Sequence, residues 1–174
     1  MADNQITRAF SLIENDESKI LQMTIGQHEN IKPGTRLGRK EAQDPPKLSF
    51  DGANRDTKYV IVSLDIDAPF PSLGILGPIL HWIQSDVTVG HSSVLEFDAP
   101  FVANWIGPAP PPGSAPHRYI FFLYEQPDSF DLKDHAPPQG KNLSNCNRMR
   151  YDLDSWVEVA GLGPLVAFNY YVCN

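Results

Sequence analysis

The stretch YVIVSLDID, residues 59–67, predicts the clearest β-strand of the chain. Successive side chains of a strand point to opposite faces, so one face is wholly apolar and the other ends in the carboxylates of Asp65 and Asp67. At a rise of about 3.3 Å per residue, these two side chains lie roughly 6.5–7 Å apart. Because the apolar face packs on the main core, we expect the acids to face a polar cavity or solvent. This segment alone is equally consistent with two exposed acids at a strand end.

Further strands are predicted on both sides of this one. They cover residues 19–26, 47–51, 79–86, 117–126 and 165–172. A helix is predicted over residues 152–160, ended by Gly161, and a short helix within residues 1–20, whereas residues 33–46 read as a polar loop. The chain has 16 Pro and 12 Gly, and its strands and helices do not alternate. These features favour a mostly β fold.

Length and composition limit the kind of protein this is. The 174 residues indicate one globular domain, residues 1–174. A net charge of -7 with only 14 Lys and Arg argues against nucleic acid and against a polybasic membrane patch. The most apolar segment, residues 73–83, is shorter than the ~18 residues of a membrane span. Since no signal-peptide pattern is visible either, we expect a cytoplasmic protein with no integral membrane association.

Cys146 and Cys173 are the two cysteines of the chain. Two cysteines this far apart make neither a disulfide framework nor a zinc motif. We expect buried thiols, because free cysteine behaves as a small apolar residue. The sequence leaves open whether the two are paired.

Two histidines stand at the starts of predicted strands. His81 begins the strand 79–86, and His117 begins the strand 117–126 after a proline-rich segment. They could meet Asp65 and Asp67 at one rim, although a histidine beside aromatic residues is more often structural. Two Asp and two His are plausible metal ligands, but the spacing supports no preformed metal site, and we expect neither metal nor cofactor. The favoured interpretation is a hydrogen-bonded cluster in which protonated histidines hold a small anion.

Four motifs in order along the chain resemble the phosphatidylethanolamine-binding protein family, which includes the Raf kinase inhibitor protein and the yeast carboxypeptidase Y inhibitor. They are DIDAP (65–69), LHW (80–82), GPAPP (107–111) and HRYIF (117–121). The likeness covers residues 20–172, and its closing segment, 151–164, is most similar to fungal members. The resemblance implies a large antiparallel β-sheet packed on a smaller sheet, with a few short helices.

The resemblance also implies a pocket for a phosphate or carboxylate group. Carried over to this sequence, its residues are Asp65, Asp67, Pro69, His81, Ala109, Pro110, Pro111, His117 and Tyr119. Both histidines would face the ligand, and the two acids would orient them and raise their pKa values, because a nearby carboxylate favours the imidazolium. Anion binding should therefore strengthen below neutral pH. The family pattern further places cis peptide bonds at Ala68-Pro69 and at Gly77-Pro78.

The segment PFPSLGILGP, residues 69–78, is uncharged where many family members carry charge. Phe70, Leu73, Ile75 and Leu76 either surround the pocket mouth as an apolar collar or pack down as a small cluster. A collar beside an anion pocket suits an amphiphile such as a lipid or an acyl chain.

Two functions remain open. The first is a non-enzymatic protein that binds a small anionic or amphiphilic ligand, or that inhibits a protein partner such as a protease. The alternative is a fungal secondary-metabolite enzyme that cyclises or dimerises carboxylate or anhydride substrates. In that case His117 or His81 would shuttle the proton, oriented by Asp65 or Asp67.

Overall fold

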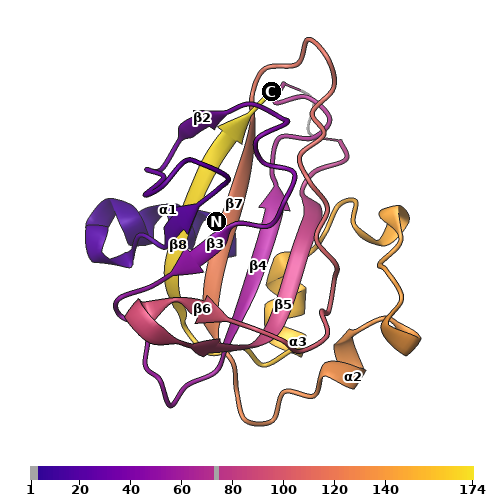
Figure 1. Cartoon of the computed structure of the whole chain (residues 1–174). Coiled ribbons are helices and arrows are strands. Elements are labelled where there is room, and N and C mark those ends of the chain that lie inside the picture. The colour runs from indigo at the N-terminus through magenta and orange to yellow at the C-terminus, as the bar shows by residue number, and fades with distance from the viewer. Residues whose placement is uncertain (1–3, 73–74) are drawn as a thin grey trace.

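The computed structural model describes residues 4–72 and 75–174, and these form a large β-sheet of six strands beside a small one (Figure 1). The strand order of the large sheet is β2-β8-β7-β4-β5-β6. In that order the bounds are Thr35–Leu37, Leu165–Cys173, His117–Glu125, Tyr59–Asp65, Ile79–Val89 and Leu95–Glu96. The small sheet pairs β1 (Gln22–Thr24) with β3 (Lys47–Ser49). The predicted mostly β fold, with a large sheet packed on a smaller one, is confirmed.

The helices are short and lie outside the sheets. They are α1 (Gln5–Asn15), α2 (Leu132–His135), α3 (Leu153–Val159) and the 3-10 turns η1 (Glu17–Lys19), η2 (His91–Ser93), η3 (Pro138–Gly140) and η4 (Asn145–Asn147). Asn4 and Asp152 cap α1 and α3 by accepting hydrogen bonds from backbone N–H groups of the first turn. Gly161 follows α3 with a positive φ of 61°, which ends that helix as predicted. Within residues 4–72 and 75–174, we find no helix with the length and apolar character needed to span a membrane.

The central strand β4 is buried along its whole length, on both faces. Tyr59 and Ile61 pack in a core with residues of β1 and β3, whereas Val60, Val62 and Leu64 pack in a second core with α1 and α3. The sequence predicted one apolar face packed on the main core, and the structure adds a second core on the other face. The two acids at its end are buried as well, so the alternative of two exposed acids is excluded.

One short strand lies where the sequence predicts a loop. β2 falls inside the expected loop 33–46 and pairs in parallel with β8, with Thr35 opposite Tyr171 and Leu37 opposite Cys173. Its three residues are too few to show an alternating pattern, and the strand exists because the edge of β8 offers backbone hydrogen-bond partners. The large sheet is consequently mixed, and antiparallel except at this edge.

The two cysteines are both free thiols, which answers the open question of their pairing. Cys173 is buried at the end of β8, as expected. Cys146 is exposed in η4, so the expectation of burial is wrong for that residue. The polar sequence around it forms a surface turn, which provides no apolar site for a thiol.

Candidate functional site

Three strand ends meet at one end of the large sheet, the upper end in Figure 1. The register of the antiparallel strands places Asp65, the last residue of β4, opposite Tyr119 of β7 and opposite Ile79 of β5. His117 is the first residue of β7, and His81 lies near the start of β5. The sequence predicted that both histidines meet both acids here, and the structure brings Asp65 to them but pairs Asp67 with Arg118.

Asp65 and His117 form a buried pair. Nδ1 of His117 lies 2.8 Å from Oδ2 of Asp65, and the two side chains are 1% and 5% exposed. A carboxylate only accepts hydrogen bonds, so Nδ1 carries a proton and donates it. The other ring nitrogen, Nε2 of His117, is buried and has no hydrogen-bond partner among the residues that the structure describes. Nε2 is therefore available for a hydrogen bond with a bound molecule.

His81 is held in a similar way by a backbone carbonyl. Its Nδ1 donates to the Ile106 oxygen at 2.8 Å, and its ring meets the Tyr119 ring edge-on with centroids 5.1 Å apart. Burial lowers the pKa of His81, and this outweighs the opposite effect of the Ile106 hydrogen bond and of Asp65. The expectation of a raised pKa is thus wrong for His81, because desolvation of the imidazolium is stronger than its attraction to a carboxylate.

Tyr119 contributes a buried hydroxyl to the same cluster. Burial, and after it the negative charge of Asp65, raises the pKa of Tyr119, so the phenol stays protonated and can donate a hydrogen bond. Its oxygen has no hydrogen-bond partner in the described part of the chain. The ring stacks on Tyr171 of β8, with centroids 5.4 Å apart, which fixes its orientation.

Asp67 is engaged by an arginine instead of a histidine. Its two carboxylate oxygens accept from Nε and Nη2 of Arg118, each at 2.8 Å, and one of them also accepts from the Arg118 backbone N–H. Burial alone would raise the pKa of Asp67, but these hydrogen bonds hold it below its ordinary value. The expectation that Asp67 orients a histidine is therefore wrong. Its role in this geometry is to join the end of β4 to the start of β7.

A cavity of about 270 Å³ opens beside His81. It is lined by Ile79, His81, Ile106, Gly107, Ala109, Asn145, Arg148 and Met149. Of the predicted site residues, His81 and Ala109 line it directly. Tyr119 stands against the His81 ring, and the Asp65–His117 pair is adjacent to it in the sheet. Pro110, Pro111 and Pro69 are outside this lining.

The segment 145–149 is the part of this site that the sequence did not point to. Asn145, Arg148 and Met149 lie far along the chain from the recognised motifs, in a stretch without regular spacing. A bridge between Ile79 and Met149, and a hydrogen bond from Leu80 N to Arg148 O, fasten this segment to β5. These are backbone contacts that any residue type can make, so the sequence offered no signal for them.

The segment that follows Asp67 borders the site with exposed apolar side chains. Phe70 is 41% and Ile75 is 53% exposed, which favours the collar over the packed cluster, whereas Leu76 is half-buried. Leu73 lies outside the described residues. Both peptide bonds that the family pattern places in cis, Ala68-Pro69 and Gly77-Pro78, are cis. Arg150 ties the segment to residues 145–149 by donating from Nε to the Ile75 oxygen.

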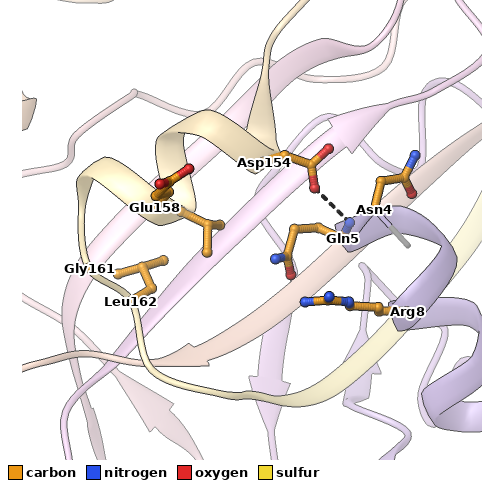
Figure 2. A pocket seen from close by; sticks show the side chains of 8 residues that line it. Asn4, Gln5, Arg8, Asp154, Glu158, Gly161 and Leu162 are labelled. Carbon is orange, nitrogen blue, oxygen red and sulfur yellow. Dashed lines mark hydrogen bonds between the residues drawn. The ribbon is translucent and has the colours of Figure 1, made fainter. Parts of the chain in front are cut away.

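A larger hollow, of about 570 Å³, lies between α1 and α3 (Figure 2). Figure 2 shows Gln5 and Arg8 entering it from α1, opposite Asp154 and Glu158 of α3. The Gln5 backbone N–H donates to Asp154 across the gap at 2.8 Å. Groups of both charges face this hollow, and it contains none of the predicted site residues.

Comparison with known proteins gives a consistent family assignment. Residues 22–170 match the sequence profile described as phosphatidylethanolamine-binding protein. Phomoidride biosynthesis cluster protein N of Talaromyces stipitatus is 28% identical in an alignment that covers 87% of this chain and 82% of that protein. The carboxypeptidase Y inhibitor of Saccharomyces cerevisiae is 31% identical, over 88% of this chain and 83% of its own.

The fold agrees with solved structures. The crystal structure of carboxypeptidase Y inhibitor complexed with the cognate proteinase superposes with a TM-score of 0.73 at 22% identity, covering 96% of this chain and 92% of that one. A phosphatidylethanolamine-binding protein from Plasmodium vivax gives a TM-score of 0.66 at 15% identity, over 88% of this chain and 84% of that one. At these identities the likeness establishes the fold.

Proposed function

Because this chain belongs to the phosphatidylethanolamine-binding protein family, we propose that it binds the anionic head group, a phosphate or a carboxylate, of a partly apolar ligand beside His81. The proposed binding residues are those of the Asp65, His81, His117 and Tyr119 cluster, with Ala109 at the cavity wall. The remaining residues of the family pattern, Asp67, Pro69, Pro110 and Pro111, would shape the surrounding loops.

The observation that carries the proposal is that two of the six buried side-chain polar atoms without a partner in the described residues lie together in this cluster. His117 Nε2 and Tyr119 Oη are both buried and unbonded within the described residues, although the large majority of buried polar side-chain atoms have a partner. Tyr119 in turn touches His81, which lines the cavity. A ligand oxygen at this point would satisfy groups that the protein itself leaves unsatisfied.

The hydrogen-bond pattern defines the kind of anion that fits. Each histidine uses its Nδ1 proton within the protein, so its Nε2 presents a lone pair when the ring is neutral and an N–H only when it is protonated. A fully ionised anion needs donors. It therefore binds together with proton uptake, or the ligand brings the proton itself, as a monohydrogen phosphate or a carboxylic acid does.

The cavity and its border suit a ligand with an apolar part. Its volume of about 270 Å³ is at the lower end of the ~300–1,000 Å³ typical of small-molecule sites, so it accommodates a head group and not a long chain. Ile79, Ile106 and Met149 line it, and Phe70 and Ile75 are exposed on the adjoining segment. An alkyl chain leaving the cavity would lie on these side chains.

Calorimetric titration with sulfate and with an alkyl phosphate tests this function. His81→Leu should weaken both affinities by about tenfold or more, since hydrogen bonds to charged groups are worth ~1.5–3 kcal/mol. The matched control is His91→Leu, which removes an exposed histidine of η2 and should change neither affinity. Failure of the unaltered protein to bind either anion, or equal binding by His81→Leu, would overturn the proposal.

The Asp65–His117 pair supports a second candidate, acid–base catalysis. A carboxylate that holds Nδ1–H and leaves Nε2 available is the arrangement of a general base, which typically contributes ~10²–10⁴-fold to a rate. The similarity to a protein named for a biosynthesis cluster also favours this candidate. The rate at which a cyclic dicarboxylic anhydride is consumed should fall in His117→Ala and not in His91→Ala. Unchanged turnover in His117→Ala, with anion binding lost, would exclude the catalytic role.

A protein partner is a third candidate, because the inhibitor of similar fold is complexed with a proteinase. Carboxypeptidase Y activity titrated with this chain tests it directly. Stoichiometric inhibition would support a protease partner, and undiminished activity at excess chain would exclude this protease.

A further inference from the structure

Arg148 is the most deeply buried charged side chain beside the cavity, at 1% exposure. Its guanidinium makes five hydrogen bonds, as many as it has N–H donors. The acceptors are the backbone oxygens of Leu80, His81, Asn104 and Leu143 and the side-chain oxygen of Asn104. Every one of these acceptors is neutral, and among residues 4–72 and 75–174 no carboxylate forms an ion pair with Arg148.

The five acceptors belong to three separate parts of the chain that surround the cavity. Leu80 and His81 are in β5, Asn104 lies just before Ile106 and Gly107 of the cavity wall, and Leu143 precedes the segment of Asn145. Asn104 also accepts from Leu143 N through its side chain, at 3.0 Å. A planar guanidinium has fixed donor directions, so it can hold these three segments at constant distances from one another.

The uncompensated charge is unusual, since buried charges in proteins are normally paired. The acids of the neighbouring strands have other partners: Asp65 accepts from His117, and Asp67 is held by Arg118. Besides these groups, the titratable side chains of the cluster are His81, Tyr119, Tyr171 and Cys173. Burial is the main cause that lowers the pKa of His81, and the positive charge of Arg148 acts in the same direction. The positive charge of Arg148 therefore contributes to the electrostatic potential at the His81 ring, which lines the cavity.

We propose that Arg148 is a positioning residue that clamps the three walls of the cavity and supplies its permanent positive charge. The inference rests on the proposed anion-binding function. It assigns to Arg148 the attraction that remains when both imidazoles are neutral. The guanidinium does not touch the ligand in this arrangement, because all its donors are used within the protein.

The test compares Arg148→Met, which removes the charge, with Arg148→Lys, which keeps it. The control is Arg55→Met, an equal change of net charge at an exposed turn before β4. Two quantities are measured: the pKa of His81 by NMR titration of its ring protons, and the affinity for sulfate, whose own charge is constant between about pH 5.5 and pH 8. Circular dichroism establishes that each variant is folded.

In Arg148→Met the pKa of His81 should rise, because a neighbouring positive charge disfavours the imidazolium. Sulfate affinity should fall about tenfold near pH 8, and by less at a pH low enough to protonate His81, whose imidazolium then also attracts the anion. Arg148→Lys keeps the charge, so the pKa of His81 should stay close to that of the unaltered protein, but it offers three donors in place of five, so the variant should be less stable. Arg55→Met should match the unaltered protein in both quantities. A loosened cavity wall would also raise the pKa of His81, because burial is the main cause of its low value, so the charge is identified by Arg148→Lys, in which the pKa of His81 should stay unchanged.

A folded Arg148→Met variant with an unchanged His81 pKa would overturn the proposal. If that variant does not fold, Arg148→Lys decides: a His81 pKa that stays unchanged in Arg148→Lys supports the charge at this position, and a raised one overturns the proposal. Absence of sulfate binding at every pH would refute the proposed function instead. In that case the pKa of His81 in the Arg148 variants would still show whether the charge of Arg148 acts on the cavity.

Discussion

Replacing Asp67 by Asn tests whether Asp67 stabilises the fold without contributing to anion binding. Asp67 is 7% exposed and receives two side-chain hydrogen bonds from Arg118, while Arg118 is 45% exposed. Removing one partner of a buried pair costs ~3–5 kcal/mol, but water can solvate the half-exposed guanidinium, so we expect a loss of about 2 kcal/mol at pH 7. For a chain of this length that loss lowers the Tm by about 4–8 °C.

The pH dependence of this loss follows from the pKa of Asp67. Its folded-state pKa lies below the ordinary value, so the carboxylate stabilises the fold above the unfolded pKa of ~3.9, and this stabilisation disappears as pH falls through the folded pKa. Urea unfolding followed by circular dichroism should therefore show a difference between the unaltered protein and Asp67→Asn at neutral pH. The difference should shrink as pH falls below about 4 and Asp67 takes up a proton, because Asn carries no charge at any pH.

Two comparisons make this prediction decisive. Lys58→Met removes the exposed Lys58–Asp86 pair and should cost less than about 1 kcal/mol. Sulfate affinity should be nearly unchanged in Asp67→Asn and should fall in Asp65→Asn, because only Asp65 orients a histidine. Equal stability of Asp67→Asn and the unaltered protein at neutral pH, or an undiminished difference in acid, would refute the reasoning.

Three further outcomes are expected. Sulfate affinity should rise as pH falls below the ordinary histidine pKa of about 6.5, because burial lowers the pKa of His81 and its Nε2 becomes a donor only when the ring is protonated; calorimetry showing no trend would contradict the hydrogen-bond assignment of His81. Phe122→Ala should lower the free energy of unfolding by ~3–5 kcal/mol, since Phe122 is fully buried against Phe168, and a loss below about 1 kcal/mol would show that the core closes around the gap. A thiol reagent at neutral pH should modify Cys146 quickly and Cys173 only on unfolding, because burial raises the pKa of Cys173 to about 11; two fast thiols would contradict this burial.

Much of the architecture could be predicted from local pattern. The alternation in residues 59–67, the dense β-favouring run of residues 117–126 and the capped helix near Asp152 are signals that neighbouring residues carry by themselves. The motifs also led to the meeting of His81, His117 and Asp65. Burial on both faces of β4 was not predicted, because apolar alternation does not reveal that a second core covers the other side.

The identity of the partners was decided by tertiary structure. Asp67 meets Arg118 and not a histidine, and His81 donates to a carbonyl 25 residues away that has no side-chain signature. Arg148 finds neutral oxygens from three segments, an arrangement that residue types and spacing do not encode. Secondary structure depends on contacts between residues near in sequence, whereas hydrogen-bond partners, burial and the pKa values that follow from them depend on which distant backbone groups the folded sheet brings within 3 Å or so. The amino-acid sequence alone therefore determined most of the strands and the family motifs. The tertiary structure determined which charged groups of the site are paired and where its protons lie.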